Sequence, residues 1–316
     1  MFRIFIVSSL VVLAVGCLTP RPALADPPKV VATIPPLHSL AAMAMEGVGY
    51  PDLLLGGGET PHSYALRPSH SRMLASADII IRIGDGFEGF LKKPLRSLAR
   101  RATILQLDVL PGVVRYANRD GGDRHEHDHH GHQHNNAGGP DSGIDPHLWL
   151  HTGNAVVILR AISAALSKAD PENAPVYKGN AARGAIRLRA LKMEIDRIVA
   201  PVRDRPYFVF HDAWQYFDRE FGLHGGGAIA ISPERKPGAR RLAETRERIR
   251  ATGARCVFAE PQFPPALVKT VIRGTAARLA FLDPLGAGLV NGPGQYSVLM
   301  RNLANGIASC LQTSSR

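Results

Sequence analysis

The sequence has few cysteines and lacks the patterns by which several common protein classes are recognised. It contains three cysteines in 316 residues, no H-E-x-x-H helix, and no helix-turn-helix, RNP or zinc-finger pattern. These absences argue against a helix-borne zinc peptidase site and against nucleic-acid binding. The net charge is +11, but no aromatic residues interleave with the arginines of the most basic stretch. We therefore expect a solvated basic face there, formed by Arg240, Arg241, Arg246, Arg248 and Arg250.

Residues 1–25 have the pattern of a secretory signal peptide. Arg3 precedes an apolar run over residues 4–15, and Ala23-Leu24-Ala25 forms an A-x-A cleavage site. The run is too short and wrongly flanked for a membrane span. Lipoprotein processing at Cys17 is an alternative, although Ala14 occupies a position where such sites favour leucine. We expect cleavage after Ala25 and a periplasmic mature protein.

Loss of the signal peptide removes Cys17 and leaves Cys256 and Cys310. Two cysteines in an exported protein are more often paired than free. A bond between them would tie the last helix to a core strand. Two buried thiols are the alternative, because cysteine is often buried in any case.

Strands and helices alternate along the mature chain, a rhythm typical of βα units and mostly parallel sheets. A length of 316 residues favours two lobes over one. The predicted class is α/β, with two lobes that each contain a mostly parallel four-stranded sheet. The strands are expected over residues 29–34, 52–55, 77–83 and 103–107, and then over 207–210, 224–231, 255–259 and 277–282. The helices are expected over 37–46, from 68 onward, and over 88–98, 151–167, 171–199, 212–221, 237–252, 264–275 and 296–311.

The helical pattern over residues 171–199 is the longest in the chain and separates the two series of strands. At roughly 1.5 Å per residue it would span about 40 Å, so it fits a rigid backbone helix between the lobes. An ordinary packing helix of the second lobe is the alternative. Its expected apolar stripe consists of Ile186, Leu188, Leu191, Ile195 and Ile198. The expected domains are a signal peptide over 1–25, an N-terminal lobe over 26–170, a linking helix over 171–201 and a C-terminal lobe over 202–316.

The N-terminal lobe contains a histidine-rich segment within residues 120–140. Residues 124–134 hold six of the thirteen histidines and no apolar side chain. Such a segment cannot offset its ordering entropy by burial, so we expect a mobile loop that binds zinc weakly and at several points. Its histidines are His125, His127, His129, His130, His132 and His134.

Four other residues stand where a cleft between the lobes would be lined. His62 follows the second strand, whereas His211 and Asp283 stand at the ends of later strands. Ligands of open α/β sheets bind outside the carboxyl ends of the strands. His147, in Asp145-Pro146-His147-Leu148-Trp149-Leu150, completes the set from the first lobe. Three imidazoles and a carboxylate suit Zn²⁺, whereas Mn²⁺ would favour more carboxylate oxygen.

The same histidines have structural alternatives. Any one of them, taken alone, fits a structural core histidine better than a metal ligand, and it is their joint placement at strand ends that favours a metal site. His151 is the most credible substitute ligand, because it lies four residues after His147 and residues four apart share a helix face. The turn before the helix is the more rigid position, so we prefer His147.

Several segments together resemble the ZnuA-type periplasmic zinc-binding proteins of ABC importers, in the cluster A-I solute-binding family. They occur in the family's order over nearly the whole mature chain. The segments are Pro61-His62-Ser63-Tyr64-Ala65-Leu66-Arg67-Pro68-Ser69, Asp145-Pro146-His147-Leu148-Trp149-Leu150, Phe210-His211-Asp212-Ala213, Ser232-Pro233-Glu234, Pro237-Gly238-Ala239, Cys256-Val257-Phe258-Ala259-Glu260-Pro261-Gln262-Phe263 and Leu282-Asp283-Pro284-Leu285-Gly286.

The resemblance implies a two-lobed fold bridged by a long helix, with the metal held in the cleft. His62, His147 and His211 match the family's zinc-binding histidines, and Asp283 matches an acidic position that is a ligand in manganese-type relatives. The histidine-rich segment matches the family's charged mobile loop. The resemblance also implies a disulfide between Cys256 and Cys310.

The chain departs from some relatives at Pro61, where they have a glutamate immediately before the first histidine. Glu59 lies nearby, three residues before His62. The fourth zinc ligand is therefore Asp283, Glu59 or water.

The expected function is zinc capture for an ABC importer, with delivery to a permease in the inner membrane. We expect a monomer that undergoes small lobe shifts, and zinc is the transported ligand, not a catalytic cofactor. A periplasmic zinc buffer or chaperone is the first alternative. A zinc hydrolase is the second, with Glu260 as the base, although its Glu-Pro-Gln turn fits a supporting role better.

Overall fold

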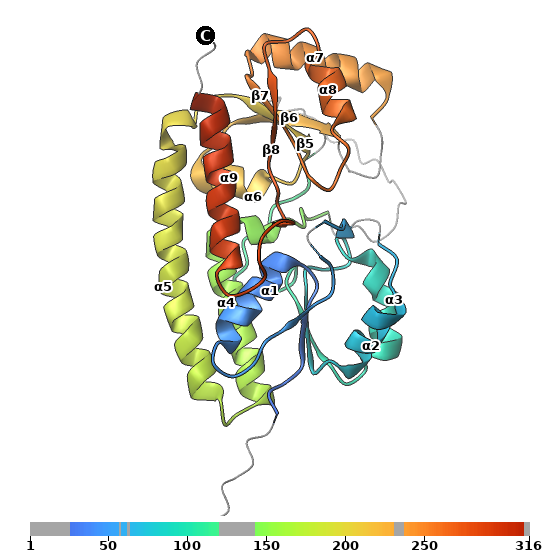
Figure 1. Cartoon of the computed structure of the whole chain (residues 1–316), viewed down its shortest axis with the longest axis vertical. Coiled ribbons are helices and arrows are strands. Elements are labelled where there is room, and N and C mark those ends of the chain that lie inside the picture. The colour runs from blue at the N-terminus through green and yellow to red at the C-terminus, as the bar shows by residue number, and fades with distance from the viewer. Residues whose placement is uncertain (1–25, 57, 62–63, 120–142, 231–236, 313–316) are drawn as a thin grey trace, which may run out of the picture.

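The structure is a computed structural model that describes residues 26–56, 58–61, 64–119, 143–230 and 237–312. The signal peptide, His62 and the histidine-rich segment lie outside these residues. Two four-stranded sheets form the centres of two lobes, one above the other in Figure 1. Each registered pair of neighbouring strands is parallel. The predicted class, with two parallel four-stranded sheets, is confirmed.

The first sheet has the order β2-β1-β3-β4, and the second has the order β6-β5-β7-β8. The first contains β1 (Val30–Ala32), β2 (Asp52–Leu53), β3 (Ile79–Arg82) and β4 (Thr103–Gln106). The second contains β5 (Tyr207–His211), β6 (Gly225–Ala230), β7 (Cys256–Ala259) and β8 (Arg278–Phe281). β3 and β5 are buried along their whole length, as expected of strands covered on both faces.

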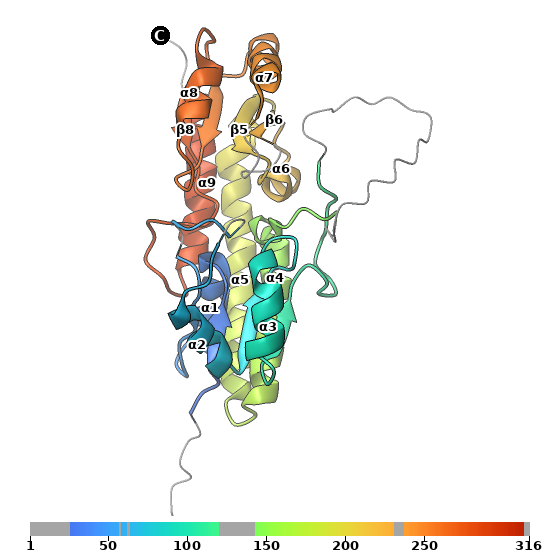
Figure 2. The ribbon, with the colours of Figure 1, turned by 90° about the vertical axis from the view of Figure 1, so that its right-hand side faces the viewer.

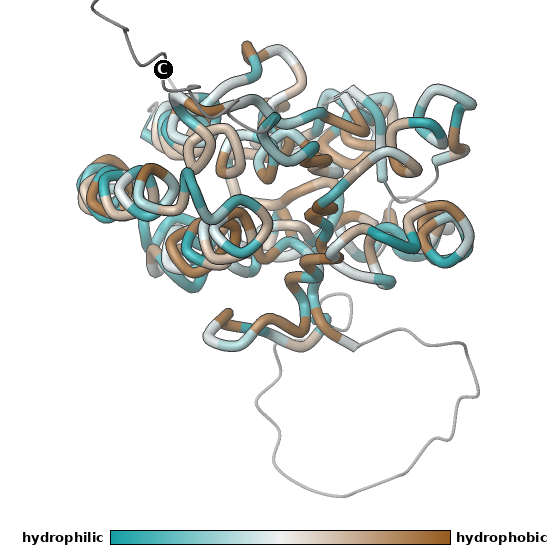
Figure 3. The backbone as a smooth tube through the Cα atoms, turned by 90° about the horizontal axis from the view of Figure 1, so that it is seen from below, coloured by the Kyte–Doolittle hydropathy of each residue, from teal (hydrophilic) through white to brown (hydrophobic). Residues whose placement is uncertain are grey.

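Helices cover both faces of each sheet. In the first lobe these are α1 (Pro35–Met45), α2 (Pro68–Ser76), α3 (Lys92–Leu98) and α4 (Thr152–Ala169). The second lobe has α6 (Gln215–Phe221), α7 (Ala239–Thr252), α8 (Ala266–Ile272) and α9 (Gln295–Gln312). Hydrophobic and hydrophilic residues alternate around the turns of the outer helices, as Figure 3 shows. This pattern lets each helix bury one side against its sheet.

The long helix α5 (Ala174–Val199) runs along both lobes and packs on α1 and α4 of the first and on α6 and α9 of the second. Figures 1 and 2 show it extending over most of the length of the molecule. Gly184 brings it close to its neighbours, because a Cβ there would lie 2.5 Å from side-chain atoms of Leu159 and of Met43. The predicted backbone helix is therefore present.

The predicted stripe of α5 is wrong at one position. Leu188, Leu191 and Ile195 are buried, but Ile186 is 65% exposed. Two residues correspond to about 200° around a helix, so Ile186 lies opposite Leu188. The buried side continues instead toward the N-terminus through Ala181 and Tyr177.

One hydrophobic core continues through both lobes. It contains Val30 and Ile81 of the first sheet, Leu188 of the linking helix, and Phe258 and Leu303 of the second lobe. Two smaller clusters fill the outer faces of the sheets, under α2 and α3 and under α7 and α8. Among the described residues, no helix has both the length and the apolarity that crossing a membrane requires.

The expected solvated basic face of α7 is only partly present. Arg240 has a side chain that is 94% exposed, but its half-buried neighbours donate to backbone carbonyl groups. Arg241 donates to Ile229 O at 2.8 Å and Arg248 to Gly226 O at 2.7 Å. β6 is an edge strand, so these arginines cover carbonyls that lack a neighbouring strand. Their positive charge therefore serves the fold.

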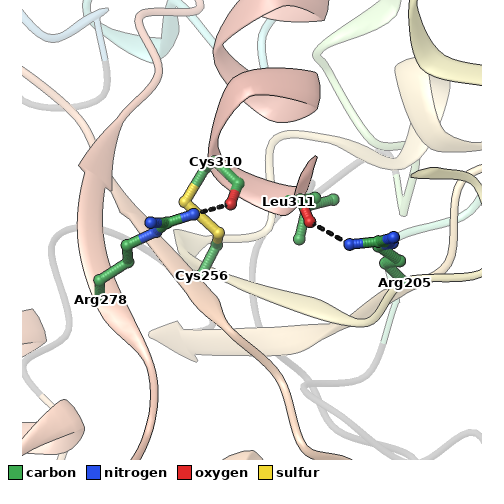
Figure 4. Close-up of a disulfide and its surroundings, with 5 residues drawn as sticks. All are labelled: Arg205, Cys256, Arg278, Cys310 and Leu311. Carbon is green, nitrogen blue, oxygen red and sulfur yellow. Dashed lines mark hydrogen bonds between the residues drawn. A yellow bond between two sulfur atoms is a disulfide. The ribbon is translucent and has the colours of Figure 1, made fainter. Parts of the chain in front are cut away.

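The predicted disulfide between Cys256 and Cys310 is present, with Cα atoms 6.2 Å apart. It joins β7 to the last turns of α9, as Figure 4 shows. Arg205 donates to Leu311 O at 2.5 Å, and Arg278 donates to Cys310 O. Cations at a helix C-terminus stabilise carbonyls that have no partner within the helix. The end of α9 is thus fixed by one covalent bond and two arginines.

Replacing both cysteines, C256A with C310A, should lower the free energy of unfolding by up to about 4 kcal/mol. The bond closes a loop with a sequence separation of 54 residues, and loop-closure entropy gives a loss of about that size. Denaturant unfolding of the oxidised protein and of the double variant measures it. A reducing agent should shift the oxidised protein toward the variant and leave the variant unchanged. Equal stability of the oxidised protein and the variant would contradict the prediction.

Candidate metal centre

His147 lies in the turn between the first lobe's last loop and α4, and Asp145 fixes it there. Asp145 Oδ1 accepts from the backbone N–H of His147 at 3.0 Å and lies 2.8 Å from Nδ1 of the same residue. Burial alone would raise the pKa of Asp145, but its hydrogen bonds with the ring and backbone N–H groups of His147, its electrostatic attraction to that ring and a hydrogen bond from Gln215 outweigh burial and lower that pKa. An ionised carboxylate only accepts, so Nδ1 carries the proton. The lone pair of His147 is then on Nε2.

His211 is the last residue of β5, and Glu260 directly follows β7 beside it. Nδ1 of His211 lies 2.6 Å from Glu260 Oε1, and both side chains are almost fully buried. Burial by itself would lower the pKa of His211, but the negative charge of Glu260 and its hydrogen bond outweigh this and raise the pKa. The same logic places the Nδ1 proton toward Glu260. Nε2 then points into the space between the lobes.

The two imidazoles face each other across the lobes. Their Nε2 atoms are 3.3 Å apart. Two nitrogen ligands of a tetrahedral Zn²⁺, each about 2.0–2.1 Å from the metal, are separated by about 3.3–3.4 Å. Two nitrogen lone pairs at this distance repel unless a cation lies between them, and either a proton or a metal ion supplies the positive charge. The pair therefore has the spacing of a zinc site.

A small cavity of about 20 Å³ adjoins the two histidines. Its volume is enough for a single water-sized occupant, which needs about 10–15 Å³. Aromatic rings surround the imidazoles: Phe87 and Trp149 lie 5.8 Å and 5.3 Å from the ring centre of His147, and Phe263 lies 5.8 Å from that of His211. The full lining is Thr60, Phe87, His147, Trp149, His211, Glu260, Gln262, Phe263, Pro284 and Leu285.

Asp283 and Glu59, the two carboxylates considered as a fourth ligand, lie outside that lining. Asp283 Oδ1 accepts from Gln262 Nε2 and from the N–H groups of Leu285 and Gly286, at 2.8–3.0 Å. Its Oδ2 accepts from the N–H of Ala287 at 2.5 Å. Glu59 accepts from Arg67 at 2.5 Å and from the N–H of Gly56 at 3.2 Å. Both carboxylates are engaged in local turns.

Residues 30–310 match the family model described as "Zinc-uptake complex component A periplasmic". The chain is 40% identical to the high-affinity zinc uptake system protein ZnuA of Brucella abortus, over 89% of this chain and 91% of that protein. It is 37% identical to the Paracoccus denitrificans protein of the same name, over 96% of this chain and 98% of that one. The chain belongs to the ZnuA family. The expected resemblance is thereby confirmed, and members of this family are transport components, not enzymes.

Solved structures share the ZnuA fold seen here. A crystal structure of ZnuA aligns with a TM-score of 0.76 at 23% identity, and the alignment covers 91% of this chain and 100% of that one. The periplasmic zinc binding protein TroA from Treponema pallidum aligns with a TM-score of 0.75 at 20% identity, covering 90% of this chain and 99% of that one. At these identities the likeness shows the fold alone.

Other histidines of this ZnuA-family chain have structural partners. His151, the suggested substitute ligand, caps α4 by accepting from the N–H of Asn154 at 3.2 Å, and it does not line the cavity. His38 Nε2 lies 2.9 Å from Pro51 O, and His70 Nδ1 lies 3.2 Å from the Tyr64 hydroxyl. Within the described residues, no group of three or more His, Cys, Asp and Glu side chains has a metal-binding arrangement. The third predicted ligand, His62, lies outside those residues.

Sequence reasoning missed that Asp145 holds the ring of His147 and that Thr60 and Phe87 line the cavity. The contact of Asp145 could have been predicted, because a carboxylate two residues before a turn histidine can reach its ring. Thr60 and Phe87 belong to loops whose approach to the cavity has no periodic signal. Glu260 contacts His211, in the supporting role that its turn suggested.

A partly buried network of two aspartates and one arginine begins at Asp212, the residue after His211. Asp212 pairs with Arg119, whose Nε donates to it at 2.7 Å. Arg119 Nη1 also lies 3.5 Å from Asp218, which accepts a hydrogen bond from Tyr207 in β5. Burial and the negative charge of Asp212 raise the pKa of Asp218 to about 6, against the opposing effects of Arg119 and Tyr207. Asp218, a carboxyl group with a pKa well above its ordinary range, thus holds Tyr207 at the start of β5 and lies beside the arginine that pairs with Asp212, the residue after His211.

The free energy of unfolding should contain a pH-dependent contribution from Asp218. Its pKa is about 6 in the folded protein and ordinarily 3.8, so between these values the folded state binds more protons than the unfolded state. The contribution is complete below about pH 4 and is lost as the pH rises through about 6, an amount of order 3 kcal/mol.

Denaturant unfolding of wild type and D218N across this pH range measures the effect. The stability advantage of wild type over the variant should shrink as the pH rises. D204N, at a side chain that is 99% exposed, serves as the matched control. A difference between wild type and D218N that does not vary with pH would refute the assignment.

Proposed function

We propose that this chain captures one Zn²⁺ ion between its lobes through His147, His211 and His62, and delivers it to the permease of an ABC importer. The observation that carries the proposal is the pair of Nε2 atoms 3.3 Å apart. Each of the two rings is held by a carboxylate on its other nitrogen. Such outer partners fix the tautomer and raise the basicity of a ligating imidazole.

A neutral ligand set suits capture followed by release. Three imidazoles and one exchangeable position leave the ion reachable by an incoming ligand, whereas four protein ligands close the site. The hydrogen bonds already made by Asp283 and Glu59 favour water as the fourth ligand. A zinc-bound ZnuA deletion mutant has the same fold, with a TM-score of 0.76, and this supports zinc as the ligand.

The remaining expectations form part of the same proposal. The mature chain acts in the periplasm as a monomer, with lobes over residues 26–170 and 202–316 and the linking helix over 171–201. The core shared by both lobes favours small shifts over wide hinge opening.

The hydrolase alternative loses support, because Glu260 is bonded to His211 and is not positioned as a separate base. Asp283 stabilises the turn that places Leu285 at the cavity.

Calorimetric titration of the mature protein should show one tight zinc site. The site should weaken by more than about 100-fold in H147A, H211A and H62A, because losing a ligand exceeds the usual cost of losing an outer partner. H224A is the matched control, since that histidine contacts Arg203 O at 3.1 Å, and its affinity should not change.

Deletion of residues 123–134 should remove weak zinc binding and keep the tight site. Retention of tight binding in H211A together with its loss in the deletion variant would transfer the main site to the histidine-rich segment. Full zinc affinity without permease stimulation in reconstituted vesicles would favour the buffer function.

Zinc affinity should fall as the pH is lowered, because the metal competes with protons for imidazole nitrogens. The pKa of His211 is raised, so the fall should begin above the ordinary histidine value of about 6.5 and continue toward pH 5. E260Q removes the charge that raises this pKa, so it should move the loss of affinity to lower pH while weakening binding at neutral pH. Competition with a chelator at about pH 5, 6, 7 and 7.5 tests this. Equal zinc affinity at the lowest and the highest pH of this series would show that these histidines are not the ligands.

A further inference from the structure

The hydroxyl group of Thr60 is buried beside the cavity without a hydrogen-bond partner among the described residues. Thr60 lines the cavity beside His147 and His211. Its Oγ1 is buried, and within the part of the chain that the structure describes it has no hydrogen-bond partner. Burying a hydroxyl without a partner is unfavourable, and valine would fill nearly the same space without that penalty. The hydroxyl is therefore placed to meet an occupant of the cavity.

Each acidic group near the cavity has at least one oxygen bonded to another residue of the protein. Glu260 Oε1 is bonded to His211, and Asp145 Oδ1 is bonded to His147. Asp283 receives four hydrogen bonds in its own turn. The oxygen that Thr60 itself offers to an occupant is neutral.

The cavity limits the size of that occupant. Its volume of about 20 Å³ accommodates one water molecule, for which about 10–15 Å³ suffices, but not a larger organic ligand. The walls formed by Phe87, Trp149 and Phe263 offer no hydrogen-bonding atoms in their rings, apart from the indole N–H of Trp149, which donates to Pro284 O at 2.9 Å. A water molecule there would need the metal and a polar side chain as its partners.

We propose that Thr60 Oγ1 accepts a hydrogen bond from a water molecule that fills the fourth coordination position of the bound zinc ion. The inference rests on the proposed function, since it requires zinc on His147 and His211. A metal-bound water is polarised, so its O–H groups are strong donors. Thr60 is a positioning residue in this arrangement: it orients the exchangeable ligand without adding a negative charge that would hold the ion more firmly.

The test compares T60V and T60S with wild type in the mature protein. T60V should weaken zinc binding by about tenfold, the lower end of the range for an outer partner, in competition with a chelator. T60S keeps the hydroxyl and should remain within about twofold of wild type. T252V, on α7 and remote from the cavity, is the matched control and should bind as wild type does.

A spectroscopic readout separates orientation of the water from simple packing. The visible absorption of the protein loaded with Co²⁺ reports the coordination geometry. It should change in T60V and remain as wild type in T60S, while thermal unfolding shows that each variant is folded. Unchanged affinity and absorption in T60V would overturn the inference, and so would equal losses in T60V and T60S. H211A distinguishes the two levels: if it abolishes binding while T60V has no effect, only the role of Thr60 fails.

Discussion

The candidate metal centre depends on two hydrogen bonds from imidazole Nδ1 atoms to buried carboxylates, Asp145 for His147 and Glu260 for His211. Each bond fixes a tautomer and a ring orientation at once. Because the two rings come from different lobes, the carboxylates set the geometry of a site that neither lobe contains alone. The negative charge at the Nδ1 edge of each ring also favours a cation between the Nε2 atoms. Rigidity and electrostatic attraction thus come from the same contacts.

The surrounding framework keeps the lobes at the distance that this pair requires. Trp149 of the first lobe donates to Pro284 O of the second, and Tyr296 at the start of α9 donates to Trp149 O at 2.7 Å. Tyr216 of α6 donates to Asp145 O at 2.9 Å. These bonds join the same residues that line or support the cavity. The same hydrogen bonds therefore position the two histidines and hold the lobes in contact.

Much of the fold was predictable because it follows from local periodicity. Continuous apolar runs such as residues 77–83 mark buried strands, and their alternation with helices predicts parallel sheets. The positions of His147 and His211 followed from strand ends and from family motifs. The cross-lobe distance between them did not, because no local rule relates β5 to the turn before α4. Ile186 was misplaced because it was assigned to the stripe by its apolar character and not by its angle around the helix. The turn-forming contacts of Asp283 likewise depend on backbone N–H groups that a sequence does not show.

The core that runs through both lobes has a consequence for how this protein can be divided. α1, α5 and α9 pack on one another, although they come from the beginning, middle and end of the chain. Dividing the chain at either end of the linking helix would expose apolar surface on both fragments. The lobes are therefore not independent folding units that could be exchanged separately. Exchange of a lobe between relatives would succeed only if the three helices were exchanged as a set. Divergence within the family is thus expected in the loops and on the outer helices, while the helical layer is inherited as one unit.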